Sequence, residues 1–326
     1  MSEKIIKAEN LQLYFPITKG FPKKVVGEVK AVDGVTFDLY KGETLGVVGE
    51  SGCGKTSLGK ALMLLERPTG GKVEYLFDGE YKDITDLKGK DLLAFRKKVQ
   101  MVFQDPYSAF NPMNTMYTSL EEPLIIHGYK NKDEREQIMV DTLNKMNVSV
   151  EYLFKYPHEL SGGQRQRLCL ARVLEIKPEV VVCDEVVSAL DVSVQAQVLN
   201  LMKDMQKEYN LTYVFIAHDL SVVQYMSDRI IVMYLGEVVE TADSLTLYNN
   251  PLHPYTESLL SAIPVPKVGE KKERIILEGD VPSPINKPKG CPFADRCNKC
   301  MEICRQEKPE LKPEGQEGHY VACHLY

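Results

Sequence analysis

The chain has 326 residues, and 40 lysines and arginines against 46 aspartates and glutamates give it a net charge of −6. The length excludes a peptide hormone, and the charge argues against a nucleic-acid binder that depends on a strongly basic surface. Hydrophobic residues make up 44% and charged residues 26%, which is typical of a globular protein with a full core. The charged first seven residues are unlike a secretion signal, and no apolar run approaches the roughly 18 residues of a membrane span. We therefore expect a cytoplasmic chain, or one that reaches a membrane through a partner.

Residues 5–46 contain short β-branched and aromatic runs of the kind that form an antiparallel sheet. Three fully apolar runs then precede helical stretches: residues 44–48 before a helix from Lys55, residues 180–183 before a helix from Val192, and residues 212–217 before a helix from Leu220. Continuous apolar strands between helices indicate a parallel sheet covered on both faces. Residues 105–175 have a mainly helical pattern and predict an inserted helical subdomain, and the absence of an internal repeat predicts one such unit.

The composition changes near Pro264. Residues 264–326 hold eight of the 18 prolines and five of the eight cysteines, with little helical or strand periodicity. This pattern predicts a body of residues 1–263 followed by an irregular Cys-rich appendage of residues 264–326. Proline-rich segments can be plain linkers, but in a reducing compartment a cysteine cluster suggests a metal more than disulfides.

The segment Gly49–Thr56 fits the pattern G-x-x-x-x-G-K-[ST] between an apolar strand and a helix start, where a phosphate-binding loop is expected. Its glycines let backbone N–H groups turn inward around phosphates, and the helix N-terminus adds partial positive charge. Lys55 reaches the β and γ oxygens, and the Thr56 hydroxyl ligates Mg²⁺. Such a loop occurs in GTPases, kinases, helicases and transport ATPases. The residues expected to contact a nucleoside triphosphate are Gly49, Ser51, Gly52, Cys53, Gly54, Lys55, Thr56 and Ser57.

Four further motifs narrow the class of protein. Leu160-Ser-Gly-Gly-Gln164 precedes a strong helix former with Ser161 as the expected N-cap, which makes a second anion site. The next apolar strand ends in Asp184 and Glu185, which suit Mg²⁺ binding through water and the polarisation of an attacking water. Ser188-Ala-Leu-Asp191 follows, and His218-Asp219 ends the strand after that.

The order of these motifs resembles one family, the ATP-binding subunits of ABC transporters, over about residues 5–245. The resemblance implies an α/β P-loop NTPase fold: a RecA-like parallel sheet core, an N-terminal antiparallel β subdomain, an inserted α-helical subdomain and the irregular Cys-rich C-terminal appendage. It also implies an ATPase in which Lys55, Gln104, Glu185 and His218 are catalytic, with Glu185 as the base.

The same resemblance implies ATP and Mg²⁺ as ligands. Thr56, Gln104 and Asp184 would hold Mg²⁺, and Phe15 would stack on the adenine. Val186 is a departure, because many members have proline after the Asp-Glu pair. Since both carboxylates are intact, we expect hydrolysis to persist.

Members of this family work as head-to-tail pairs, in which each nucleotide lies between the phosphate loop of one subunit and the signature motif of the other. ATP closes the pair, and hydrolysis opens it because loss of the γ-phosphate removes the bridge. The resemblance therefore assigns a second set of residues to the nucleotide bound by the partner: Ser161, Gly162, Gly163, Gln164 and Asp191.

Longer stretches resemble the oligopeptide/dipeptide permease ATPases, specifically their F-type subunit: Phe103-Gln-Asp-Pro-Tyr-Ser, Tyr156-Pro-His-Glu-Leu-Ser-Gly-Gly-Gln, Asn250-Pro-Leu-His-Pro-Tyr-Thr and Gly279-Asp-Val-Pro-Ser-Pro-Ile. This implies a peripheral subunit at the cytoplasmic face of the membrane that powers import of peptides, nickel chelates or oligosaccharides. Its partners would be a D-type ATPase, an extracytoplasmic binding protein and two permease subunits, whose coupling helices would dock after Gln104. We expect no nucleic-acid partner. The alternatives are a soluble ABC ATPase acting on nucleic acid or the ribosome, and a metal-sensing regulatory ATPase.

The appendage cysteines have the spacing Cys291-x5-Cys297-x6-Cys304-x18-Cys323, with Cys300 as an additional thiol. The branch commonly shows the four-cysteine pattern, and the resemblance implies a [4Fe-4S] cluster on it. Four thiolates from a compact loop also suit Zn²⁺. A third interpretation is a set of reduced cysteines packed as small hydrophobic residues.

Overall fold

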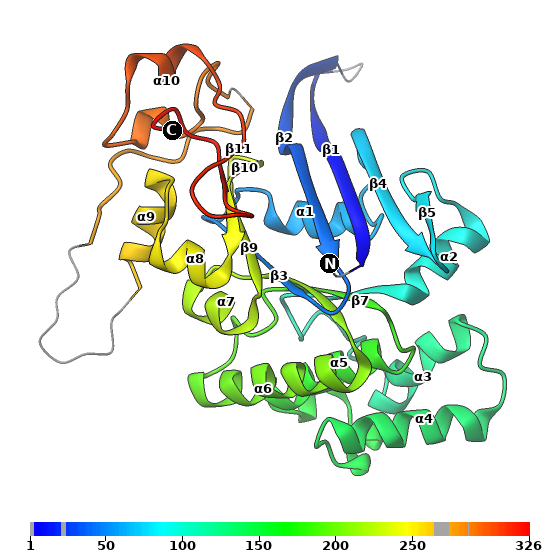
Figure 1. Cartoon of the computed structure of the whole chain (residues 1–326). Coiled ribbons are helices and arrows are strands. Elements are labelled where there is room, and N and C mark those ends of the chain that lie inside the picture. Colours follow the sequence, from blue (N-terminus) through cyan, green and yellow to red (C-terminus); the bar gives the residue numbers. More distant parts are fainter. Residues whose placement is uncertain (1–2, 21–23, 264–273, 286) are drawn as a thin grey trace, which may run out of the picture. The chain divides into compact units, whose positions relative to one another are not determined.

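The computed structural model describes residues 3–20, 24–263, 274–285 and 287–326 (Figure 1). The chain divides into two compact units. We call residues 1–86 and 215–326 the terminal unit, and residues 87–214 the central unit. The predicted boundary after residue 263 meets residues 264–273, which lie outside the described residues. The described residues of the appendage, 274–285 and 287–326, are called the tail below and belong to the same compact unit as the N-terminal strands.

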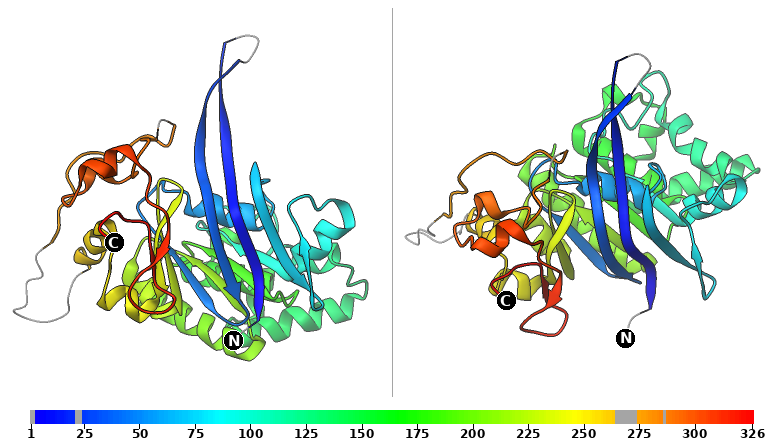
Figure 2. Two further views of the ribbon diagram at one scale, coloured as in Figure 1. Left: turned by 45° about the horizontal axis from the view of Figure 1, so that its top comes forward. Right: turned by 90° about the horizontal axis from the view of Figure 1, so that it is seen from above.

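The terminal unit begins with an antiparallel sheet of four strands in the order β2-β1-β4-β5. β1 and β2 run side by side as a long hairpin (Figure 2), with Tyr14 opposite Lys30 and Ile17 opposite Gly27. The antiparallel sheet predicted within residues 5–46 is therefore confirmed. The strands are β1 (Lys4–Lys19), β2 (Lys24–Tyr40), β4 (Gly70–Phe77) and β5 (Glu80–Asp83).

Within the terminal unit, the second sheet contains the strands β11-β12-β10-β9-β3, in that order. β3 and β9 are parallel, while β9, β10, β12 and β11 pair antiparallel. All five residues of β3 are buried, as expected for a strand covered on both faces. The strands are β3 (Thr44–Val48), β9 (Arg229–Tyr234), β10 (Glu237–Asp243), β11 (Lys312–Pro313) and β12 (Tyr320–Val321).

Helices of the terminal unit pack closely on this sheet. A Cβ atom added at Gly46 in β3 would lie 2.5 Å from the Ser227 hydroxyl oxygen and 2.6 Å from a Val223 methyl carbon, so only glycine fits this apolar strand. The helices are α1 (Lys55–Leu62), α7 (Leu220–Met226), α8 (Ser244–Asn249), α9 (Pro254–Ser261) and α10 (Glu302–Gln306), with the 3₁₀ helix η3 (Ala294–Arg296).

The central unit is mainly helical, and its strands β6 and β7 pair in parallel. Helices begin at Val192 in the central unit and at Lys55 and Leu220 in the terminal unit, as the sequence predicts. The elements are α2 (Gly89–Lys98), β6 (Val99–Val102), α3 (Met116–Ile126), α4 (Lys132–Lys145), η1 (Val150–Phe154), η2 (Pro157–Glu159), α5 (Gly162–Leu174), β7 (Val180–Asp184), α6 (Val192–Tyr209) and β8 (Thr212–Ile216), which crosses into the terminal unit. Among the described helices, none combines the length and apolar character needed to cross a bilayer.

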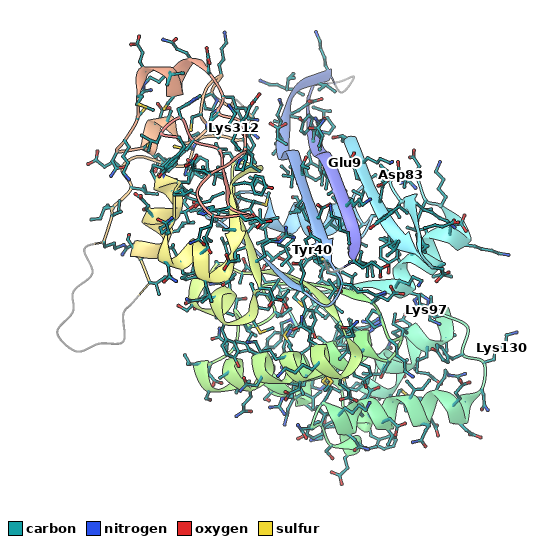
Figure 3. The ribbon with its side chains drawn as sticks, viewed as in Figure 1. Glu9, Tyr40, Asp83, Lys97, Lys130 and Lys312 are labelled. Carbon is teal, nitrogen blue, oxygen red and sulfur yellow. The ribbon has the colours of Figure 1, made fainter. Side chains whose placement is uncertain are left out.

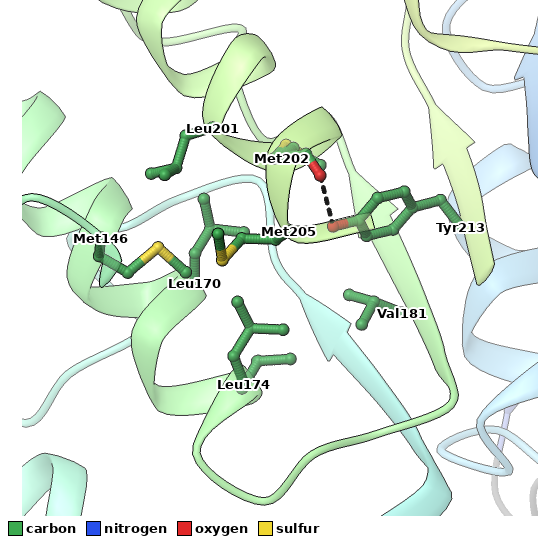
Figure 4. Close-up of a pocket in the computed structure, with 9 residues that line it drawn as sticks. Met146, Leu170, Leu174, Val181, Leu201, Met202, Met205 and Tyr213 are labelled. Atoms are coloured by element: carbon green, nitrogen blue, oxygen red, sulfur yellow. Dashed lines mark hydrogen bonds between the residues drawn. The ribbon is translucent and has the colours of Figure 1, made fainter. Parts of the chain in front are cut away.

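The core of the central unit is closely packed. Leu170 of α5, Met205 of α6 and Val181 of β7 line an apolar cavity of only about 10 Å³ (Figure 4). The buried Tyr213 satisfies its hydroxyl by donating to the carbonyl oxygen of Met202, 3.1 Å away (Figure 4). Charged side chains such as Lys130 are exposed and project from the ribbon (Figure 3). This packing gives the motifs on α5 and β7 a rigid support.

Candidate nucleotide site

The phosphate loop connects β3 to α1 in the terminal unit and is shaped by glycines. Gly49 has a φ of 152°, and a Cβ atom there would lie 2.2 Å from the Met233 carbonyl oxygen. Gly54 has a φ of 104°, and its Cβ would lie 2.0 Å from the carbonyl oxygen of Ala31. Both positions therefore require glycine for conformation and for space.

Lys55 begins α1 and is 5% exposed. Its ammonium group donates to the carbonyl oxygens of Gly49, at 2.8 Å, and Glu50, at 3.0 Å, so the loop curls around its own lysine. The N-cap is Gly54, which has no side chain to satisfy the first N–H groups of the helix. Thr56, in the first turn, is exposed. The result is a concentration of positive charge and N–H donors suited to phosphate oxygens.

Two other predicted residues lie in the terminal unit. Phe15 on β1 is 36% exposed, whereas the hydroxyl of its neighbour Tyr14 donates to Asp33. Of the two aromatic rings, Phe15 thus presents the more accessible face. His218 is exposed and follows β8, directly before the helix N-cap Asp219.

In the central unit, two predicted catalytic side chains meet. Asp184 ends β7 and is 3% exposed, and Glu185 follows it with a φ of 49°. A left-handed conformation is uncommon for glutamate and turns the chain sharply at the strand end. The Gln104 amide donates to the Glu185 carboxylate over 2.7 Å. The structure therefore brings Gln104 and Glu185 together at the end of a buried strand.

The signature motif starts α5, also in the central unit. The Ser161 hydroxyl accepts a hydrogen bond from the Gln164 N–H at 3.3 Å, and the Gln164 side chain accepts one from the Ser161 N–H at 2.9 Å. The predicted N-cap is confirmed and forms a capping box. A Cβ on Gly163 would lie 2.5 Å from Val194, which explains that glycine. Asp191 caps α6 by accepting from the Val194 N–H at 3.0 Å.

Asp191 also accepts from the Ser193 hydroxyl, which holds the pKa of its carboxyl below the usual value. This carboxylate therefore stays ionised at neutral pH.

Several side chains that support these motifs carry little signal in the sequence. Arg165 is buried, donates twice to the Leu160 carbonyl oxygen and stacks 3.7 Å above the Tyr107 ring, which links α5 to the segment after Gln104. In the sequence, only the position of Arg165 directly after Ser161-Gly-Gly-Gln164 indicates that it supports the motif. Two residues from the C-terminal part of the chain, Tyr255 and Arg296, contact the phosphate loop at Glu50.

The tail cysteines gather near one another in the terminal unit. Burial raises the pKa of the Cys291 thiol to about 12, and the nearby thiols of Cys304, Cys323 and Cys297 add to this rise. The Cys291 N–H donates to the Cys304 carbonyl oxygen at 2.7 Å. No group of three or more His, Cys, Asp or Glu side chains in the described parts of the chain is arranged to hold a metal ion. The thiols are therefore chemically suitable metal ligands, but in this structure they are not arranged around a common point that a metal ion could occupy.

Two protein-family models match the chain. The model described as "ABC transporter" matches residues 32–188, which include the phosphate loop, the signature motif and the Asp-Glu pair. The model described as "Oligopeptide/dipeptide transporter, C-terminal region" matches residues 239–304, within the terminal unit.

Curated relatives align over almost the whole chain. It is 49% identical to the oligopeptide transport ATP-binding protein AppF of Bacillus subtilis (strain 168), covering 99% of this chain and 98% of that protein. It is 45% identical to the dipeptide transport ATP-binding protein DppF of Escherichia coli (strain K12), covering 99% and 95%.

Among solved structures, the ATP-binding cassette MJ0796, a post-hydrolysis dimer bound to ADP and Pi, matches with a TM-score of 0.63 and 26% identity. That match covers 74% of this chain and 99% of MJ0796. CbiO1 of Clostridium perfringens matches with a TM-score of 0.64 and 25% identity, over 76% of this chain and 92% of that one. The predicted P-loop NTPase fold is confirmed by these matches. The chain therefore belongs to the ABC transporter family, as an ATP-hydrolysing subunit of its oligopeptide/dipeptide branch.

Proposed function

We propose that the chain binds ATP through the phosphate loop and uses its hydrolysis to power the import of oligopeptides or dipeptides. The observation that carries this proposal is the loop itself, in which two obligatory glycines surround a buried lysine ammonium at a helix start. The relatives are oligopeptide and dipeptide transport ATP-binding proteins, which favours transport over action on nucleic acid or metal sensing. Nickel chelates and oligosaccharides remain alternative cargoes. ATP-dependent peptide uptake by the reconstituted transporter tests the proposal, and uptake that continues without this subunit contradicts it.

For the chemistry, we propose Thr56, Gln104 and Asp184 as the residues that hold Mg²⁺, because they carry the oxygen donors that this ion prefers. When bound, Mg²⁺ neutralises charge on the phosphate oxygens. Glu185 would accept the proton of the attacking water, and the hydrogen bond from Gln104 orients its carboxylate. His218 and Lys55 would contact the γ-phosphate, and Phe15 would stack on the adenine.

Replacing Glu185 with glutamine tests the base. The amide keeps the shape of the side chain but cannot take up the proton, so turnover should fall by roughly 10²–10⁴-fold while ATP binding persists. ATP should then trap the closed pair, which size-exclusion chromatography with ATP detects. Unchanged steady-state hydrolysis would exclude Glu185 as the base.

We further propose that the chain is the F-type subunit of a heterodimer with a D-type ATPase. Ser161 to Gln164 and Asp191 would then contact the nucleotide held by the phosphate loop of the partner. Ser161 is exposed, and its two hydrogen bonds with Gln164 fix the start of α5. This supports the role, because the N-terminus of the helix faces solvent. Ser161→Ala in the heterodimer should impair hydrolysis at the partner's phosphate loop. A loss of the same size in the isolated chain would refute site sharing.

Membrane attachment would occur through two permease subunits, with an extracytoplasmic binding protein on the other side, and would place this chain at the cytoplasmic face. A groove of about 380 Å³ in the central unit suits the docking of a permease coupling helix. It includes Phe103, next to Gln104, together with Pro123 and Ile126 of α3. Phe103 and Ile126 are 44% and 54% exposed, so apolar surface is available for a partner.

Neighbouring isoleucines provide a matched pair of variants for this groove. Ile125 and Ile126 are both 54% exposed, but only Ile126 lines the groove. Ile126→Asp should reduce co-purification with the permease subunits and leave the ATPase activity of the isolated chain intact. Ile125→Asp should leave both intact, and equal effects of the two substitutions would contradict docking here.

We propose that Cys291, Cys297, Cys304 and Cys323 bind a [4Fe-4S] cluster, with Zn²⁺ as the alternative. The mutual proximity of the four thiols supports this, and binding would require them to draw together into a ligand geometry. Iron, sulfide and zinc contents of anaerobically purified protein distinguish the two metals. Cys304→Ser should abolish the metal, whereas Cys300→Ser should retain it. Colourless, iron-free protein would exclude the cluster.

A further inference from the structure

Glu50, inside the phosphate loop, is held by two residues far along the chain. Its backbone N–H donates to the Tyr255 hydroxyl at 2.7 Å. Its two carboxylate oxygens accept from the two terminal nitrogens of Arg296, at 2.6 and 3.0 Å. This forked pairing fixes the orientation of the carboxylate more firmly than a single hydrogen bond would.

Arg296 is itself immobilised. Its side chain is only 7% exposed, and it also donates to the Tyr234 hydroxyl at 3.4 Å. It lies at the end of η3, which is anchored by the buried Phe293. The Phe293 ring packs against the rings of Tyr234 and Tyr255, with centroid separations of 5.3 Å in both cases. Arg296 therefore belongs to a packed aromatic cluster and differs from a solvated surface ion pair.

A chain of buried hydrogen bonds supports Tyr255. Its N–H donates to Nδ1 of His253, at 3.0 Å, and burial lowers the pKa of His253 to about 3, so this imidazole is neutral and can accept. Glu240 accepts from the His253 N–H at 3.0 Å and pairs with Nε2 of His319 at 2.7 Å. His319 comes from the tail, so tail residues support both contacts to Glu50.

We propose that Arg296 is a positioning residue for nucleotide binding. It would hold Glu50, and through it the phosphate loop, in the conformation that receives the triphosphate. It would also neutralise a carboxylate that otherwise repels the phosphates. This inference rests on the proposed role of the loop in binding ATP. It gives the tail a role in nucleotide affinity, exerted through Glu50, that is separate from metal binding.

The test uses the full chain and measures the dissociation constant for a fluorescent ATP analogue, with kcat, KM and the melting temperature recorded for every variant. Arg296→Met should weaken nucleotide binding about tenfold, as expected for loss of a charged hydrogen-bond pair, with a larger effect on KM than on kcat. Arg296→Lys should restore part of the affinity, because it keeps the charge and loses the fork. Arg305→Met is the matched control, since Arg305 pairs at 2.6 Å with Asp295 in the same tail but is 61% exposed.

A double variant shows whether Arg296 acts through Glu50. In a Glu50→Gln background the repelling charge is gone, so Arg296→Met should have little further effect. Unchanged affinity in Arg296→Met, or a tenfold loss that persists in the Glu50→Gln background, would overturn the inference. If Arg296→Met lowers the melting temperature strongly, the same comparison is made with Arg296→Lys. Lys55→Ala should abolish binding, and binding that survives it would refute the loop as the ATP site instead.

Discussion

Glu175, directly after the signature helix α5, is a buried carboxyl that should destabilise the folded chain. It is 1% exposed, and neither of its oxygens has a hydrogen-bond partner among the described residues. Burial raises its pKa well above the ordinary value of 4.5, against the opposing effect of Arg172. Leaving a buried polar group without a partner costs about 1–3 kcal/mol. Replacing Glu175 with methionine, of similar length and without oxygens, should therefore stabilise the chain by about that amount, or roughly 2–4 °C per kcal/mol in a melting curve.

The pH dependence of unfolding gives a second readout. Between the unfolded and folded pKa values the folded chain keeps the Glu175 proton that the unfolded chain has lost, so stability falls as the pH rises above about 4.5. This part of the slope should disappear in Glu175→Met. Glu179, paired with Lys98 at 2.5 Å and partly exposed, is the control, and its methionine variant should lose a little stability. Destabilisation by Glu175→Met, or an unchanged pH slope, would refute the reasoning.

Two further predictions concern packing and buried charge. Gly46→Ala should lower stability by about 1–3 kcal/mol, because its methyl group would overlap Ser227 and Val223; denaturant unfolding measures this, and a neutral result would mean that α7 moves freely. Glu240→Gln should cost about 3 kcal/mol, since Glu240 is fully buried and pairs with His319; a melting temperature equal to that of the unmodified chain would contradict the buried pair.

Local patterns in the sequence sufficed to predict the phosphate loop and the helix starts. A strand, glycines and a lysine at fixed spacing occupy one continuous segment, and the Ser161 cap involves a residue only three positions away. Family resemblance assigned catalytic roles to Gln104 and Glu185, but it did not predict the hydrogen bond between them, because 81 positions separate the two residues.

Other features carry no local signal. Arg296 and Glu50 are 246 positions apart, and an isolated arginine in a proline-rich segment is typical of a solvated surface. The burial of Glu175 is equally hidden, because a glutamate after a helix ordinarily faces water. Such contacts depend on the tertiary arrangement of each unit, which periodicity and composition do not encode.

The composition of the tail does not reveal that it packs as part of the terminal unit. Its prolines favour a linker, yet β12 extends the sheet of the terminal unit beside β10. Lys287 pairs with Asp33 at 2.9 Å and with Glu237 at 3.1 Å, and all three side chains are mostly buried. Removing the tail would leave these mostly buried carboxylates without the Lys287 ammonium group. The loss of folding free energy should be larger than for an exposed ion pair. The tail is therefore a structural part of the unit that carries the phosphate loop, and a chain cut after residue 263 should lose stability as well as any function of the cysteines.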